Sequence, residues 1–285
     1  MTSKVKRVAR FSTGTVDIHP QHAYRGRSPM YWWLLTSRQW LTSRPINVYV
    51  IEHADGLVVF DAGQDRASVT DAGYFPDGLV GMVYDRLARF DIGETETFRA
   101  GLDRLGYGAA DVTTAVISHL HQDHIGGIRE MPQAELLVSP DEWRSLRRPL
   151  AEARGLLRTH IDIPGLHWSP VQFEPLARRA GSSLGPFTSG RDLFEDGSLI
   201  LLPTPGHTPG SMSLLVRRNG GPPLLLVGDL TYDIHAFERG VHSGVGRRRR
   251  LARTRQAVLA LRAANPDLRI LAAHDPAAAE LLEAA

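Results

Sequence analysis

The stretch that decides the fold is Ser118-His119-Leu120-His121-Gln122-Asp123-His124-Ile125-Gly126-Gly127. It holds three imidazoles and one carboxylate within six residues, 119–124. In an extended segment His119 and His121 face the same side, so one metal ion could bind both. Asp123 and His124 follow past the strand end, where a turn can aim them at a second position. Imidazole and carboxylate are the ligands expected of Zn²⁺, Mn²⁺, Fe²⁺ or Co²⁺ in sites without thiols.

An alternative interpretation of this stretch is a polar loop with solvated histidines. We disfavour it, because histidines crowded at this spacing repel one another when they are protonated. Gly126 and Gly127 let the backbone turn sharply, as a metal site above them would require. The chain contains no cysteine, which excludes disulfides, thiolate ligands and a cysteine nucleophile. Any metal must therefore be held by His, Asp or Glu.

The composition is that of an ordinary globular protein, with 42% hydrophobic and 22% charged residues among 285. Lys and Arg (33) nearly balance Asp and Glu (31), so the charge favours neither a nucleic-acid nor a membrane partner. No apolar run follows the basic N-terminus, and no stretch approaches the ~20 apolar residues that cross a bilayer. We therefore expect a cytoplasmic protein.

Several short apolar runs predict strands that end at a polar residue. Asp61, His119, Asp229 and His274 each follow such a run directly or nearly so. Side chains at strand ends are held rigidly yet face a cleft, so these ends together predict a sheet-based active site. The expected strands are 46–51, 57–60, 113–118, 136–138, 199–202, 213–216, 224–227 and 269–273. Helices are expected over 98–105, from 140 onward and over 251–264, and irregular structure over 149–191.

The motif His-x-His-x-Asp-His resembles that of the metallo-β-lactamase superfamily. Four further motifs stand in the order of that family, at Asp61, His207, Asp229 and His274. The resemblance implies an α+β fold, the αββα sandwich, in which two mixed β-sheets are flanked by helices.

The resemblance covers roughly residues 45–275, most of the chain. We expect a single domain over residues 1–285, in which residues 1–44 are an N-terminal extension that packs on the core or at a dimer interface. Related lactonases are often dimers, so a homodimer stands as an alternative to a monomer.

The family pattern also implies the metal ligands and the cofactor. The first ion would be held by His119, His121 and His207, and the second by Asp123, His124 and His274. Asp229 would bridge the two ions, and Asp61 would support the ligands from behind. A hydroxide between the ions would be the nucleophile, because two cations lower the pKa of water. Two divalent ions are expected, Zn²⁺ first, with Fe, Co or Mn as alternatives.

Tyr232, three residues after Asp229, looks like a tyrosine of the N-acyl-homoserine lactonases, which degrade quorum-sensing signals. There it hydrogen-bonds the substrate carbonyl, where a phenol stabilises the developing oxyanion. Asp123 could then pass a proton to the ring oxygen as it leaves. The resemblance thus implies lactone hydrolysis with Asp123, Tyr232 and Asp229 as catalytic residues. A packing role is the alternative for Tyr232.

Other branches of the superfamily fit less well. The lactamase classes need a cysteine ligand or lack the bridging carboxylate of Asp229. The oxygen-reducing di-iron flavoproteins usually place Glu where this chain has His121. A glyoxalase-II-like ester or thioester hydrolase and a phosphodiesterase or nuclease remain alternatives, the latter because of the basic cluster Arg247–Arg250. A metal-free scaffold is the least favoured, since every ligand position holds a competent side chain.

An acylated substrate needs an apolar slot beside the metals. Trp32, Trp33, Phe75 and Phe237 are the candidates for its lining, with ordinary core packing or a dimer contact as the alternative. His235 could also touch substrate, although a solvated histidine is favoured. Gln122 stands where several lactonases have an aromatic residue, which leaves the substrate range open.

Overall fold

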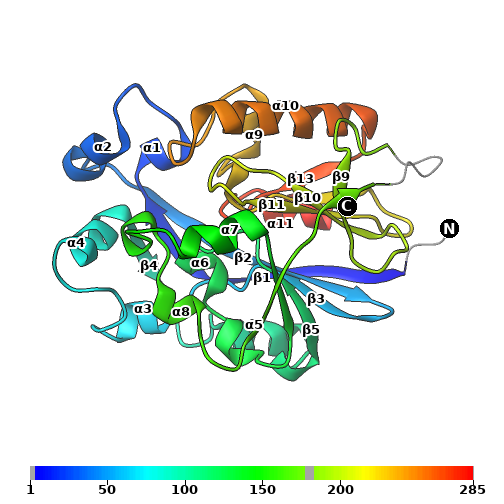
Figure 1. Ribbon diagram of the computed structural model, residues 1–285, viewed down its shortest axis with the longest axis horizontal. Coiled ribbons are helices and arrows are strands. Elements are labelled where there is room, and N and C mark those ends of the chain that lie inside the picture. The colour runs from blue at the N-terminus through cyan, green and yellow to red at the C-terminus, as the bar shows by residue number, and fades with distance from the viewer. Residues whose placement is uncertain (1–3, 177–182, 285) are drawn as a thin grey trace.

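The protein is built of two β-sheets packed face to face, with helices on the outer face of each (Figure 1). The computed structural model describes residues 4–176 and 183–284. Strands up to Pro170 form the first sheet, and strands from Glu174 onward form the second. This arrangement confirms the αββα sandwich with two mixed sheets.

The first sheet has seven strands in the described part of the chain, in the order β4-β1-β2-β3-β5-β6-β7. Neighbours from β4 to β3 run antiparallel, whereas β3, β5, β6 and β7 run parallel. The strands are β1 (Val5–Ile18), β2 (Leu41–His53), β3 (Gly56–Phe60), β4 (Ala88–Asp91), β5 (Val112–Val116), β6 (Glu135–Val138) and β7 (His167–Pro170).

The second sheet follows the order β13-β12-β11-β10-β9-β8. Strands β12 and β13 run parallel, and all other neighbouring strands run antiparallel. Its strands are β8 (Glu174–Pro175), β9 (Ser189–Asp192), β10 (Leu199–Pro203), β11 (Met212–Val216), β12 (Leu224–Leu226) and β13 (Arg269–Leu271).

Both faces of each sheet are buried along its central strands, because side chains alternate along a strand and both sides of these strands are apolar. In β2, Val48 and Val50 pack under the helices of the first sheet, while Tyr49 and Ile51 pack between the sheets. The second sheet repeats the pattern: Leu224 and Leu226 face the first sheet, and Leu225 faces the outer helices. The expected strands are confirmed, with ends that differ by a few residues.

The helices cover the outer faces. The structure has α1 (Pro20–Ala23), α2 (Met30–Thr36), α3 (Ala67–Thr70), α4 (Gly78–Leu87), α5 (Phe98–Leu105), α6 (Gln122–Ile125), α7 (Pro140–Leu146), α8 (Arg158–Ile161), α9 (Ile234–Glu238), α10 (Arg248–Ala264) and α11 (Ala278–Glu283). The expected α5 is confirmed, and Gly106 ends it in the left-handed conformation, φ 88°. Ser139 caps α7 by accepting from Glu142 N. α10 begins three residues before the expected start at Leu251.

The N-terminal segment 1–44 differs from the extension that the sequence suggested. Residues 5–18 form β1, which lies inside the first sheet between β4 and β2. The expected boundary at 44 falls within β2, which begins at Leu41. β1 escaped prediction because its alternation is broken by polar residues and by register shifts against β2.

The segment 149–191, expected to be irregular, contributes only short elements where it is described: a 3₁₀ turn (Glu152–Arg154), α8, β7, β8 and the start of β9. Residues 177–182 lie outside the described residues. In the described part of the chain, no helix has the length and apolar character needed to cross a membrane.

Phe11 tests whether β1 belongs to the core. Its ring packs edge-on against Phe98 of α5, with centroids 5.9 Å apart. We expect Phe11→Ala to lower the free energy of unfolding by about 3–5 kcal/mol through lost burial and the cavity left behind. Lys6→Ala, on the exposed side of the same strand, should change it by less than about 0.5 kcal/mol. Denaturant unfolding measures both, and equal small effects would contradict a core role for β1.

Candidate metal centre

The seven side chains expected to bind metal converge at one edge of the two sheets. His119, His121, Asp123 and His124 follow β5, and the other three follow strands of the second sheet, His207 after β10, Asp229 after β12 and His274 after β13. Five of the seven are buried, whereas His121 and Asp123 are partly exposed. They form three overlapping groups of three that could each hold an ion: His119, His121 and His207; His119, His124 and Asp229; and Asp123, His124 and His274.

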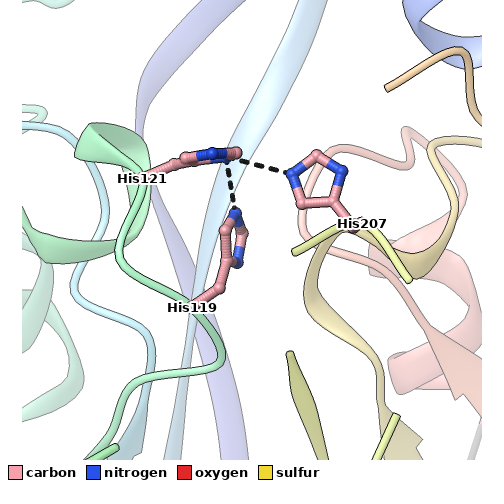
Figure 2. A group of neighbouring side chains, drawn as sticks. All are labelled: His119, His121 and His207. Atoms are coloured by element: carbon pink, nitrogen blue, oxygen red, sulfur yellow. Dashed lines mark hydrogen bonds between the residues drawn. The ribbon is translucent and has the colours of Figure 1, made fainter. Parts of the chain in front are cut away.

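The first group is a cluster of three imidazoles. His121 Nδ1 lies 3.0 Å from His119 Nε2 and 3.0 Å from His207 Nε2, so three ring nitrogens face one point (Figure 2). His119 and His121 come from the loop after β5, whereas His207 comes from the β10–β11 loop of the other sheet. Rings at this distance cannot all point protons inward, and lone pairs aimed at a shared cation fit the arrangement.

The other end of the site, the second group, is formed by Asp123, His124 and His274 and combines a carboxylate with two imidazoles. Asp123 Oδ2 lies 3.3 Å from His274 Nε2, and Asp123 Oδ1 lies 3.7 Å from His124 Nε2. Asp229 stands between the groups: its Oδ2 is 3.5 Å from His207 Nε2, and its Oδ1 is 3.3 Å from both His124 Nε2 and His274 Nε2. One oxygen thus faces each group, which is the geometry that a bridging carboxylate requires.

Unpaired atoms at the second group match a cation site. His124 Nε2, His274 Nε2 and Asp229 Oδ1 are buried and make no hydrogen bond with the described residues. Buried polar atoms without partners cost free energy, and their convergence on one point indicates an absent ligand. Imidazole and carboxylate are the donors that divalent first-row ions take, so these residues fit the group that the family pattern implies.

The histidines of the two groups differ in their pKa values. Burial lowers the pKa of His207 to about 3 and, together with the neighbouring rings, lowers the pKa of His119 well below its ordinary value. Both rings are therefore neutral and ready to bind a cation at neutral pH. Burial also acts on His124, but the carboxylates of Asp61, Asp229 and Asp123 outweigh it and raise the pKa well above its ordinary value. A cation at the second group would replace that proton.

Asp61 supports the ligands from behind. Its Oδ2 lies 2.8 Å from His124 Nδ1, and Ser118 donates to it twice, from N to Oδ1 (2.7 Å) and from Oγ to Oδ2 (3.0 Å). The carboxylate thereby leaves His124 Nε2 facing the site. His274 is oriented in the same way, with Nδ1 2.9 Å from the Pro45 carbonyl oxygen. Asp61 adopts φ 60°, the left-handed conformation, directly after β3.

Glu142 is a supporting residue that the sequence did not reveal. It is fully buried in α7, and its carboxylate accepts from Leu120 N (3.2 Å, Oε1) and Gly210 N (3.1 Å, Oε2). Leu120 lies between His119 and His121, and Gly210 follows His207 by three residues. Glu142 therefore joins the two loops that carry the three-imidazole group. In the sequence, an acidic residue in the first turn of a helix looks like ordinary helix stabilisation. Only the contacts of Glu142 with the two loops show its supporting role.

Tyr232 reaches the site, where its hydrogen-bond partner within the protein is Asp229. Its hydroxyl donates to Asp229 Oδ2 (2.7 Å), and its ring stacks on His274 with centroids 5.6 Å apart. Burial and the nearby Asp229 charge raise the pKa of this phenol well above its ordinary value, so it stays a donor. The hydroxyl therefore lies against the carboxylate that stands between the two groups.

A largely apolar pocket opens onto this edge. Asp123, His121, His207, Asp229, His274 and Tyr232 form its floor, and α2, α4 and β4 supply most of its walls. The apolar wall residues include Ile18, Met30, Leu34, Val83, Leu87 and Phe90.

The four aromatic residues expected to line the pocket lie elsewhere. Trp33 is buried against the rings of His19 and His22, and Trp32 is 66% exposed on the outside of α2. Phe75 packs on Tyr74 and Tyr84 beside another hollow, and Phe237 lies in the core under α10. On α2 the pocket is lined instead by Met30, by the buried Leu34 and by the largely exposed Tyr31.

The remaining polar candidates are also away from the pocket wall. His235 is exposed on α9, and Arg247–Arg250 are exposed where α10 begins. Neither set belongs to the pocket lining.

A protein-family model described as the metallo-beta-lactamase superfamily matches residues 41–274. The chain belongs to this superfamily. Among curated relatives of this superfamily member, the N-acyl homoserine lactonase AttM of Rhizobium radiobacter is 31% identical over 238 residues, covering 81% of this chain and 82% of its own. A probable metallo-hydrolase of Mycobacterium tuberculosis is 31% identical over 248 residues, covering 81% and 74%.

Solved structures share the superfamily fold. An N-acyl homoserine lactone hydrolase with the product N-hexanoyl-L-homoserine bound at its catalytic metal center superposes with a TM-score of 0.76 at 20% identity, covering 98% of this chain and 96% of its own. AidC, a dizinc quorum-quenching lactonase, gives a TM-score of 0.61 at 17% identity, covering 96% and 91%.

Glu142→Gln tests the tie between the two ligand loops. The amide retains one acceptor but turns an N–H₂ toward a backbone N–H, so one loop loses its anchor. We expect metal affinity, measured by competition with a chelator, to fall about 10- to 100-fold. Asp141→Asn, exposed on the same helix and paired with Arg144, is the matched control and should leave affinity unchanged. Unaltered affinity in Glu142→Gln would show that the loops need no such tie.

Proposed function

We propose that this superfamily member is a dinuclear metal-dependent hydrolase that opens the lactone ring of N-acyl-homoserine lactones. The observation that carries the proposal is the pair of His/Asp groups joined by Asp229 at the floor of an apolar pocket, with the Tyr232 hydroxyl beside them. The lactonases among the relatives support the choice of substrate.

The ligand assignment follows the two groups. His119, His121 and His207 would hold one ion, Asp123, His124 and His274 the other, and Asp229 would bridge. Zn²⁺ is the proposed metal, with Fe, Co or Mn as alternatives. Bound cations lower the pKa of water toward neutrality and polarise a carbonyl oxygen.

The protein's own groups handle the remaining charges. The Tyr232 phenol, held neutral by burial beside Asp229, would turn its single O–H from Asp229 Oδ2 to the carbonyl oxygen as negative charge develops on it. Asp123 lies in the pocket floor as a carboxylate, since His124 and His274 outweigh burial and lower its pKa. It can accept a proton from the attacking water and pass it to the ring oxygen.

These transfers balance the reaction. The water oxygen forms a bond to the carbonyl carbon, and the bond from that carbon to the ring oxygen breaks. The proton carried by Asp123 converts the leaving oxygen to a hydroxyl group. The product is an N-acyl-homoserine, whose new carboxylic acid ionises and releases a proton at neutral pH.

The proposal extends to the setting of the enzyme. Its partner would be a small acylated lactone or ester rather than nucleic acid or a membrane, as the near balance of charges favours. It would act in the cytoplasm as one domain over residues 1–285. A homodimer is the alternative to a monomer.

Ring opening of short- and long-chain N-acyl-homoserine lactones by metal-loaded protein is the direct test. Proton release in weak buffer follows the reaction. We expect a kcat/KM above ~10⁴ M⁻¹s⁻¹, the range of ordinary enzymes. Negligible turnover with two metals bound would reject the lactonase and shift the assignment to thioesters, other esters or phosphodiesters.

Tyr232→Phe removes the proposed oxyanion donor and keeps the ring. We expect kcat to fall roughly 10²-fold with metal content unchanged, since a single donor of this kind contributes about that much. Tyr24→Phe, whose hydroxyl bonds Asp233 away from the pocket, is the control and should keep the wild-type rate. A wild-type kcat in Tyr232→Phe would leave the phenol with a packing role only.

Asp229→Asn removes the charge between the two groups. We expect the protein to retain at most one ion per chain by elemental analysis, because a neutral amide bridges two cations poorly. Asp85→Asn, exposed on α4, should retain both. Two ions bound in Asp229→Asn would refute the ligand assignment.

A further inference from the structure

Two residues that line the pocket each carry a buried polar atom without a hydrogen-bond partner among the described residues. His22 Nδ1 and Gln122 Oε1 make no hydrogen bond with the described residues, and both side chains line the pocket while each residue is only 5% exposed. Neither belongs to the metal-ligand set or to the proton path proposed above.

His22 is held firmly in this position. It lies in α1, where its carbonyl oxygen accepts from Gly244 N (2.7 Å) and its ring packs edge-on against Trp33, with centroids 4.9 Å apart. The Tyr232 ring is its other neighbour, at 6.4 Å. Burial lowers the pKa of His22 to about 3, so the ring is neutral and offers one N–H donor and one acceptor.

Gln122 approaches the pocket from the metal side. It is the first residue of α6 and lies between His121 and Asp123, one member of each proposed ligand group. Its carboxamide oxygen is therefore close to the reacting centre. A hydrocarbon side chain could fill this position in the pocket wall. A buried amide with an unpartnered oxygen is less stable there, and packing alone does not explain its presence.

The unsatisfied atoms indicate which chemical group a ligand would need to carry. A buried polar atom without a hydrogen bond is destabilised, and a ligand that supplies the bond recovers that free energy. Gln122 Oε1 accepts only, so the ligand must carry a donor. His22 can donate through Nδ1. A secondary amide offers an N–H and a C=O together, and therefore matches both atoms.

We infer that His22 and Gln122 form a polar subsite for the amide that joins the acyl chain to the lactone ring, with the amide N–H donated to Gln122 Oε1 and the amide C=O accepting from His22 Nδ1. This subsite rests on the proposed function and would explain how the enzyme chooses among lactones. It makes the enzyme selective for N-acylated lactones over lactones that carry a plain alkyl chain.

The experiment compares two lactones in matched variants. N-hexanoyl-homoserine lactone carries the amide, and a γ-lactone with an alkyl chain of similar length lacks it. His22→Leu and Gln122→Leu remove the polar atoms, and His235→Leu makes the same kind of change on exposed α9 as the control. Metal content and thermal unfolding identify any variant that is damaged, and His22→Phe and Gln122→Met replace it.

We expect each pocket variant to lose about 10-fold or more in kcat/KM for the amide lactone. The alkyl lactone should be turned over equally well or better, and the control should match wild type with both. Equal losses with both lactones, or no loss with the amide lactone, would overturn the subsite.

Binding of products separates this inference from the proposed function. If wild type opens neither lactone, the proposed function fails. Calorimetry with ring-opened N-hexanoyl-homoserine and with the matching hydroxy acid that lacks the amide then decides the subsite. Weaker binding of the amide product alone in the His22 and Gln122 variants supports it, and any other pattern overturns it.

Discussion

Burial of both faces of each sheet is the constraint on which the site depends. A strand between two apolar layers has no place for a charged side chain along its length, because an unpaired buried charge is costly. Buried charged groups therefore gather past the strand ends, while neutral polar side chains such as Thr13 and Ser213 do occur within strands. Asp61, His119, Asp229 and His274 stand at such ends, and the layering that excludes them from the core also gathers them at one edge.

At that edge the charges stabilise one another. Asp229 is buried among His124, His207 and His274, with its two oxygens facing different rings. Two of these imidazoles are in turn fixed from behind, His124 by Asp61 and His274 by the Pro45 carbonyl. The ligands thus need little rearrangement to take a cation, and Glu142 extends this support to the backbone of two loops.

The sequence predicted the parts of the fold that local pattern determines. Apolar runs such as those in β3 and β12 and the Gly106 helix end could be located because burial and backbone geometry leave them few alternatives. The ligand set was predictable because it stands in ordered motifs, and the structure brings all seven residues together.

What could not be predicted depends on contacts between distant segments. Polar residues interrupt the apolar alternation of β1, so its sequence does not show which side is buried. Its role in the sheet is evident only from its pairing with β2 and β4. The pocket lining was misjudged for the same reason. Which face of α2 turns inward is set by its packing near α4, so Met30, Tyr31 and Leu34 line the pocket and Trp32 does not.

Neither half of the chain contains a complete site. Each outer group takes two side chains from the half that builds the first sheet and one from the half that builds the second: His119 and His121 with His207, and Asp123 and His124 with His274. Backbone bonds between Met212 N and the Ser118 carbonyl, and between Asn47 N and the Ala273 carbonyl, join the same halves nearby. A bound ion would therefore link the two sheets directly. Metal binding and the association of the two sheets would then be thermodynamically coupled, so that each stabilises the other.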